Sequence, residues 1–208
     1  MDFIAKNVAE LAPSMTLSIT SQAKALKKQG VDVLSFGAGE PDFDTPKHIV
    51  EAAVKALHDG QTRYTESAGL LELREGIAAK LMIDNGLQYE ASQISVNCGA
   101  KHSCYNAILA VVNPGDEVII PAPYWTSYPE MVRLAGGIPV IVDTKIENGW
   151  KITPEEFEDA MSPLTKMIIM NSPGNPTGSV YSKEELEKIV LMLSPIVPHI
   201  CHALWQEL

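Results

Sequence analysis

The chain has 208 residues, of which 46% are hydrophobic and 20% charged, and its formal net charge is −10 at pH 7. This length and hydrophobic content favour one large or two small folded domains with a buried core over a disordered protein. Because the chain has 26 acidic and only 16 basic residues, the sequence argues against a general nucleic-acid binder. Its apolar runs are also shorter than the roughly 18 residues of a membrane-spanning helix.

The N-terminus and the cysteines favour a cytoplasmic protein. Residues 1–6 lack the basic stretch and apolar block of a secretion signal. Cys98, Cys104 and Cys201 are an odd number without a CxxC pair, which indicates free thiols in a reducing compartment. We expect Cys98 and Cys104 to be small buried packing residues.

The hydrophobic pattern predicts helices first and then an alternation of strands and helices. Residues 15–29 read as an amphipathic helix with Gly30 just beyond its end, and helical spacing returns over 46–58 and 69–85. From residue 94 onward, we predict strands at 94–97, 117–120, 138–142 and 166–170, and helices at 101–112, 126–135, 154–161 and 182–192. Short strands separated by helices are typical of βαβ units, so the predicted fold class is α/β with a mostly parallel sheet.

Two of the predicted helices carry an N-terminal capping signature. Thr153 precedes the helix at 154–161 with Glu156 three residues later, and Ser182 precedes the helix at 182–192 with Glu185 in the same relation. This spacing predicts reciprocal side-chain to backbone hydrogen bonds at both helix starts.

Three loops that follow predicted strands have an unusual composition. Gly99-Ala100-Lys101 opens a helix, residues 121–129 present Trp125 between prolines, and residues 171–178 are rich in Pro, Gly and Asn. Taken singly, the first could be an ordinary tight turn, the second could carry plain core or interface aromatics, and the third could be an ordinary loop. Parallel sheets bind ligands at the carboxyl ends of their strands. Together the loops predict a phosphate cradle, an aromatic plate and an amide for a flat, phosphorylated heteroaromatic cofactor.

Several ordered motifs resemble those of the class I aminotransferases, the pyridoxal-phosphate-dependent enzymes of the aspartate aminotransferase fold type. The motifs are residues 37–46 (GAGEPDFDTP), 63–65 (RYT), 69–74 (GLLELR), 113–117 (NPGDE), 123–125 (PYW) and 175–178 (NPTG). The resemblance covers about residues 5–190 and is greatest to the bacterial aspartate/prephenate aminotransferases.

The resemblance implies a pyridoxal 5'-phosphate site in the second half of the chain. The backbone amides of Ala100 and Lys101, after Gly99, would hold the cofactor phosphate. Trp125 would stack on the pyridine ring, and Asn175 would bond its ring hydroxyl. The protein would orient the cofactor, which supplies the chemistry.

The resemblance also implies substrate contacts and a partner. Gly39, Trp125 and Asn175 would bind the substrate, Gly39 through a backbone contact to its α-carboxylate. Tyr64 would reach the cofactor phosphate of a neighbouring subunit, which implies a homodimer. The implied substrates are an amino acid, aspartate or a similar one, and a 2-oxo acid.

The family's remaining functional groups would follow residue 190, where this sequence departs from the family. There we would expect an Asp for the ring nitrogen, a Tyr, the Schiff-base Lys and a substrate-binding Arg, but residues 191–208 do not match the family. Ser182-Lys183 reads as a capped surface turn, so we assign no catalytic residue in this chain. We therefore expect the N-terminal half of an aminotransferase, a truncated or frame-shifted product that is inactive alone.

The expected organisation is an incomplete fold type I enzyme. We predict an N-terminal arm with part of the small domain at 1–45, a partial large cofactor-binding domain at 46–190 and a divergent tail at 191–208. The alternatives are a carbon–sulfur lyase on the same scaffold and a non-catalytic fragment that binds a partner subunit. His199, Cys201 and His202 match no zinc spacing, so no metal is expected.

Overall fold

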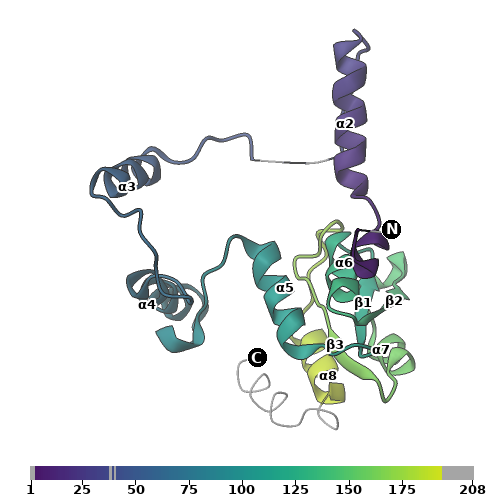
Figure 1. Cartoon of the computed structure of the whole chain (residues 1–208). Helices are drawn as coiled ribbons and strands as arrows, with labels where there is room; N and C mark the ends of the chain where they lie inside the picture. Colours follow the sequence, from purple (N-terminus) through teal and green to yellow (C-terminus); the bar gives the residue numbers. More distant parts are fainter. Residues whose placement is uncertain (1–2, 38, 40, 194–208) are drawn as a thin grey trace. The chain divides into compact units, whose positions relative to one another are not determined.

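The computed structural model describes residues 3–37, 39 and 41–193, which Figure 1 traces through the helices and strands. Contacts within the chain divide it into two compact units. We call Met1–Ala12 together with Cys98–Leu208 the sheet unit, and Pro13–Asn97 the helical unit. The predicted tail from residue 194 onward lies outside the described residues, as do Ala38 and Glu40 of the first motif.

The helical unit contains the helices that the hydrophobic spacing predicts. They are α2 (Met15–Lys28), α3 (Lys47–His58) and α4 (Leu71–Lys80), which continues into the π-helical turn η1 (Leu81–Asn85) before the 3-10 turn η2 (Ala91–Gln93). Gly30 ends α2 at φ +81°, and the Val31 N–H donates to the Leu26 carbonyl at 3.1 Å. This bond completes the predicted glycine cap.

Arg74 ties α4 to the loops around it. Its guanidinium donates to the carbonyl oxygens of Gly69 at 3.0 Å and Ala91 at 3.2 Å, and it pairs with the Glu66 carboxylate. Arg74 is only 8% exposed. A buried cation is tolerated when it is paired and hydrogen-bonded, so these contacts explain how the charge can sit there.

The strand predicted at residues 94–97 does not form, which corrects the sequence-based prediction. The Val96 N–H instead donates to the Ala68 carbonyl at 2.9 Å, and the Val96 side chain lies against Gly69. A Cβ at Gly69 would lie 2.8 Å from the Val96 Cβ. An apolar run becomes a strand only beside a backbone that offers a ladder of partners, and the neighbour here is a loop.

The sheet unit is an α/β structure with three parallel strands in the order β2-β1-β3. Its elements are α1 (Lys6–Ala9), α5 (Ala100–Val111), β1 (Glu117–Ala122), α6 (Ser127–Leu134), β2 (Ile138–Asp143), η3 (Ile146–Asn148), α7 (Pro154–Ala160), β3 (Thr165–Ile168) and α8 (Lys183–Leu193). β1 pairs with β2 from Glu117↔Ile138 to Ala122↔Asp143. Its pairing with β3 contains a register shift next to Glu117.

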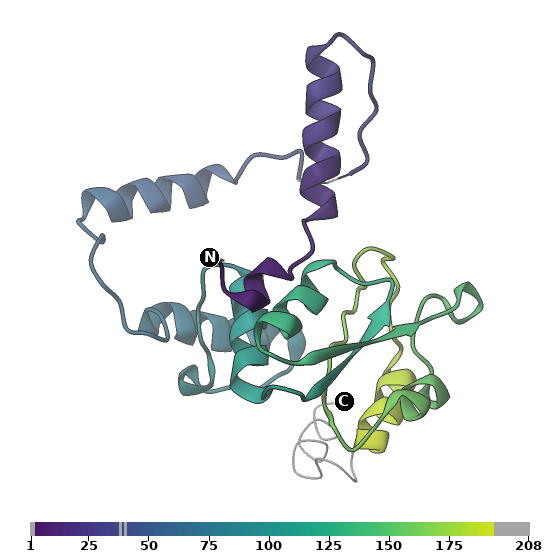
Figure 2. The same ribbon diagram turned by 45° about the vertical axis from the view of Figure 1, so that its right-hand side comes forward.

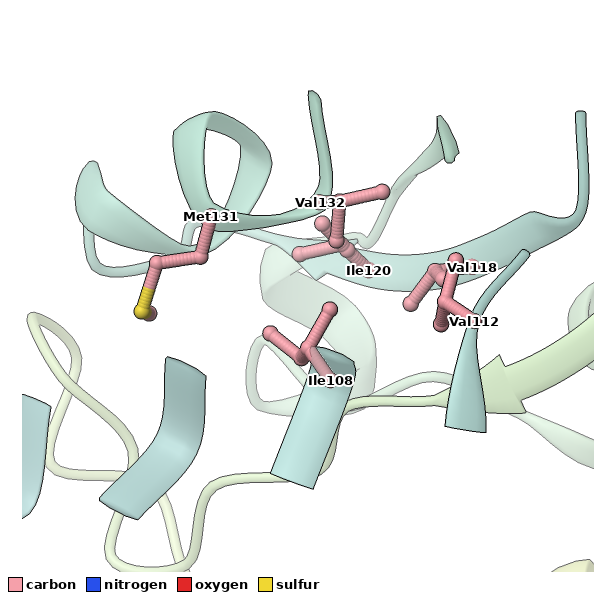
Figure 3. Close-up of a cluster of buried hydrophobic side chains, with 6 residues drawn as sticks. All are labelled: Ile108, Val112, Val118, Ile120, Met131 and Val132. Atoms are coloured by element: carbon pink, nitrogen blue, oxygen red, sulfur yellow. The ribbon is translucent and has the colours of Figure 1, made fainter. Parts of the chain in front are cut away.

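Hydrophobic side chains cover both faces of β1. On one face, α5 and α6 bury a cluster around Val118 and Ile120, shown in Figure 3: Ile108, Val112, Val118, Ile120, Met131 and Val132. On the other face, Ile119 packs against Phe157 of α7 and Ile189 of α8. Because successive side chains of a strand alternate between faces, the run Val118-Ile119-Ile120 supplies both clusters. Figure 2 shows the strands of the sheet unit from a second direction.

Both predicted capping signatures are present. The Glu156 N–H donates to Thr153 Oγ1 at 3.2 Å, and the Thr153 N–H donates to Glu156 Oε2 at 3.0 Å. The Ser182 N–H donates to Glu185 Oε2 at 2.7 Å, and the Glu185 N–H donates to Ser182 Oγ at 3.2 Å. These bonds fix where α7 and α8 begin.

The described helices include none that is both long and apolar enough to cross a membrane.

Replacing Thr153 by Ala should destabilise the sheet unit by about 1 kcal/mol, because the Glu156 N–H loses its cap. Thr153→Ser keeps the hydroxyl and should stay close to wild type. Urea unfolding followed by tryptophan fluorescence measures both variants. Equal losses in the two would show that the cap bond does not stabilise α7.

Candidate functional site

The candidate site lies at the carboxyl ends of β1 and β3. Both strands run parallel, so the loops that follow them leave from the same edge of the sheet. The first loop carries Trp125, and the second carries Asn175. The start of α5 belongs to the same sheet unit.

Gly99 shapes the start of α5. It is the N-cap residue at φ +88° and ψ 164°, a backbone conformation that side chains with a Cβ rarely adopt. Its carbonyl accepts the N–H groups of His102 at 3.1 Å and Ser103 at 3.3 Å. Ala100 and Lys101 come before these residues, in the turn where a helix leaves its N–H groups without carbonyl partners. Such N–H groups, with the helix dipole behind them, favour an anion.

His102 supports this turn from the helix surface. Its Nδ1 atom accepts the Cys98 N–H at 3.4 Å, and the side chain is exposed. Cys98 is exposed as well, which corrects the prediction that it is buried. Cys104 packs against the cluster of α5 and α6, which confirms its predicted packing role, but it is only partly buried. Cys98 differs because it stands in the loop before α5 and not on the face of that helix that meets the sheet.

Trp125 connects the start of α5 to the loop after β1. The Lys101 Nζ atom lies 4.9 Å from the centroid of the Trp125 ring, a cation–π contact. Tyr128 meets the same indole edge-on, with ring centroids 5.4 Å apart and an interplanar angle of 87°. Both aromatic rings are half-buried against the cluster of α5 and α6. Trp125 therefore has a packing role as well as a ring that a planar ligand could contact.

Asn175 lies on a loop whose conformation is fixed by hydrogen bonds within the loop itself. The Asn175 N–H donates to Asn171 Oδ1 at 2.9 Å, and the Gly174 N–H donates to the Ser179 carbonyl at 2.8 Å. The Asn175 side chain is exposed and lines a small pocket together with Tyr124 and Tyr128. Tyr128 touches both Trp125 and this pocket, so the three predicted features of the sheet unit are neighbours in space.

Sequence reasoning missed Tyr181, which forms part of the wall of this pocket. Its hydroxyl accepts the Ile152 N–H at 3.0 Å, and its own N–H donates to Ser172 Oγ at 3.1 Å. Burial raises the pKa of Tyr181, so the phenol stays neutral at pH 7. Burial also raises the pKa of Tyr128. No local motif marks Tyr181, because its partner Ile152 is distant in the sequence.

Gly39 and Tyr64 belong to the helical unit, and both are exposed. No heavy atom lies within 4 Å of a Cβ built on Gly39. Their implied contacts to substrate and to a partner's cofactor stay predictions.

Over the described residues, no group of three or more His, Cys, Asp or Glu side chains is arranged to hold a metal ion. The tail residues His199, Cys201 and His202 lie outside those residues.

Comparisons with known proteins agree with the motifs. The aminotransferase class I and II family matches residues 31–194. The aspartate aminotransferase of Geobacillus stearothermophilus is 53% identical over 186 residues, which are 89% of this chain and 47% of that protein. The aspartate/prephenate aminotransferase of Cereibacter sphaeroides is 50% identical over 199 residues, which are 95% of this chain and 50% of that protein.

A solved structure supports the same relationship. Aspartate aminotransferase from Thermus thermophilus with maleate superposes with a TM-score of 0.89 at 45% identity, over 94% of this chain and 51% of that one. The chain thus spans about half the length of the relatives it matches. The family match and these identities together show that the chain belongs to the class I and II aminotransferases.

Proposed function

We propose that the sheet unit binds pyridoxal 5'-phosphate and serves an aminotransferase of the aspartate aminotransferase type. The observation that carries the proposal is the contact between Lys101 and Trp125, since it joins the start of α5 to the aromatic loop. Asn175 lines the adjoining pocket. The helix start suits the phosphate of this cofactor, the indole suits its pyridine ring, and the amide suits its ring hydroxyl.

Each of these residues has a distinct task in the proposed site. The amides of Ala100 and Lys101 bind the phosphate, and the dipole of α5 adds to the attraction. Trp125 fixes the plane of the ring, and the Asn175 amide donates a hydrogen bond to its hydroxyl. The cofactor, when bound, supplies the electron sink, while these residues orient it.

The side chain of Lys101 also contributes to the proposed site, in addition to its backbone amide. Its ammonium lies over one face of Trp125 at 4.9 Å. A planar ring therefore stacks on the other face or displaces the ammonium. In either case, the positive charge stays near the first turn of α5 and favours an anionic ligand.

We extend the proposal to the reaction and the assembly. The reaction is the transfer of an amino group between an amino acid, aspartate or a similar one, and a 2-oxo acid. The names of the Geobacillus and Cereibacter relatives support this substrate class. We propose a homodimer in which Tyr64 reaches the partner's cofactor phosphate, and a backbone contact from Gly39 to the substrate carboxylate. The domain boundaries at residues 45 and 190 and a cytoplasmic location complete the proposal.

Gly99→Ala should weaken pyridoxal phosphate binding about tenfold. The methyl group disfavours the φ of +88° that presents the amides of Ala100 and Lys101. Equilibrium dialysis of the 208-residue chain against the cofactor measures the affinity.

Gly115→Ala is the matched control, because Gly115 has nearly the same φ, +91°, in the turn that follows α5. It should cost similar stability and leave binding unchanged. Equal weakening by both substitutions would contradict a phosphate site at Gly99.

Borohydride reduction of the chain with pyridoxal phosphate should give no stoichiometric adduct at a single lysine, because no lysine of this sequence matches the family's Schiff-base position. Peptide mass spectrometry measures the labelling at each lysine. One stoichiometric adduct, at Lys101 or Lys183, would contradict our assignment of no catalytic lysine in this chain.

A further inference from the structure

The loop after β3 is attached to a distant segment of the chain, residues 149–152, which we call the brace. The Ser179 hydroxyl donates to the Gly149 carbonyl at 2.5 Å. The Tyr181 hydroxyl accepts the Ile152 N–H at 3.0 Å. Ile152 is itself buried in the hydrophobic cluster that α7 and α8 cover. The brace therefore connects the loop after β3 to the core of the sheet unit.

Lys151 adds a link between the brace and the start of α8. Its Nζ atom lies 2.6 Å from Glu185 Oε1 and 2.8 Å from Glu185 Oε2, and 5.9 Å from the centroid of the Tyr181 ring. The same carboxylate accepts the Ser182 N–H at 2.7 Å, the bond that begins α8. Charge-assisted hydrogen bonds of this kind are the stronger ones in proteins. The brace thus also holds the point where the loop after β3 passes into α8.

The backbone of the brace has an uncommon conformation. Gly149 has a φ of +64° and Trp150 a φ of +57°. Both values lie in the left-handed region, which glycine enters freely and tryptophan rarely does. Successive residues of an extended chain point to opposite sides, whereas Gly149, Lys151 and Ile152 all contact the segment that runs from the loop after β3 into α8. The left-handed turn at Trp150 is what allows these contacts.

The side chain of Trp150 lines the same small pocket as Asn175, together with Tyr128 and Tyr181. It is 39% exposed, so most of the indole is covered by its neighbours. A glycine would adopt the backbone conformation of Trp150 without strain, so the contacts of the indole must offset the strain that tryptophan brings. Disfavoured backbone conformations persist where the surrounding structure over-determines them, and they cluster at functional sites.

We propose that Trp150 is a positioning residue of the candidate site. Its left-handed backbone keeps the brace in the conformation that binds the loop after β3. Its ring forms the wall of the pocket that Asn175 also lines, and so limits the directions in which the Asn175 amide can point. Only the last step, from this amide to the ring hydroxyl of the cofactor, rests on the proposed function.

Hydrogen exchange of the 208-residue chain, read by NMR without cofactor, tests this positioning directly. The Asn175 N–H donates to Asn171 Oδ1 at 2.9 Å, so its exchange rate reports whether the loop keeps its conformation. Trp150→Gly accepts the left-handed backbone and removes the ring, and it should speed this exchange about tenfold. Trp150→Phe keeps an aromatic wall and should stay within about twofold of the wild-type rate.

Ile146→Gly is the matched control, because Ile146 lies in the turn before the brace and its side chain is 64% exposed. It adds the same backbone freedom and should leave the exchange of the Asn175 N–H unchanged. Equal acceleration by Ile146→Gly and Trp150→Gly, or no acceleration by Trp150→Gly, would overturn the proposal. Circular dichroism checks the folding of each variant. If Trp150→Gly does not fold, Trp150→Asn replaces it, because asparagine also tolerates the left-handed region.

Equilibrium dialysis then measures whether the positioned amide serves the cofactor. It compares pyridoxal phosphate with an analogue in which hydrogen replaces the ring hydroxyl. Trp150→Gly should weaken binding of pyridoxal phosphate about fivefold and leave binding of the analogue unchanged. The double variant with Asn175→Ala should bind no more weakly than Asn175→Ala alone, because both changes act through one hydrogen bond.

Additive losses in the double variant, or equal losses for both compounds, would overturn the action of Trp150 through Asn175. A wild-type chain that binds neither compound would contradict the proposed function. The exchange measurement contains no cofactor, so it still decides the role of Trp150 in that case.

Discussion

The sheet unit depends on one strand that is buried on both faces. Val118, Ile119 and Ile120 of β1 are all 0% exposed. Val118 and Ile120 pack against the helices on one face of the sheet, and Ile119 packs against the helices on the other face. Full burial of each such side chain contributes roughly 1.5–3 kcal/mol. Because β1 also hydrogen-bonds both β2 and β3, it holds together the sheet edge from which the two loops of the candidate site leave.

The candidate site follows from that arrangement. The loop after β1 presents Trp125, and the residues beyond β3 lead into the loop with Asn175. Tyr181 holds that second loop against the buried backbone at Ile152, so its position depends on the core and not on its own sequence alone. The site is thus built on rigid supports, and the side chain of Asn175 stays exposed at its rim.

Features that depend on neighbours in the sequence were predictable, whereas features that depend on distant partners were not. The caps at Thr153 and Ser182 and the glycine end of α2 at Gly30 formed as predicted, because each needs only a few adjacent residues. The strand at residues 94–97 did not form, because a strand needs a neighbouring strand to hydrogen-bond with, and the local sequence does not show whether one is present. The strand order, the register shift beside Glu117 and the part played by Tyr181 are equally non-local.

The measurement that tests the central claim most directly is an NMR titration of the amide-labelled chain with pyridoxal phosphate and, separately, with pyridoxal, which lacks the phosphate. Our account predicts that the amide signals of Ala100 and Lys101 move saturably with pyridoxal phosphate and far less with pyridoxal. Signals that do not move, or that respond equally to both compounds, would contradict a phosphate site at the start of α5.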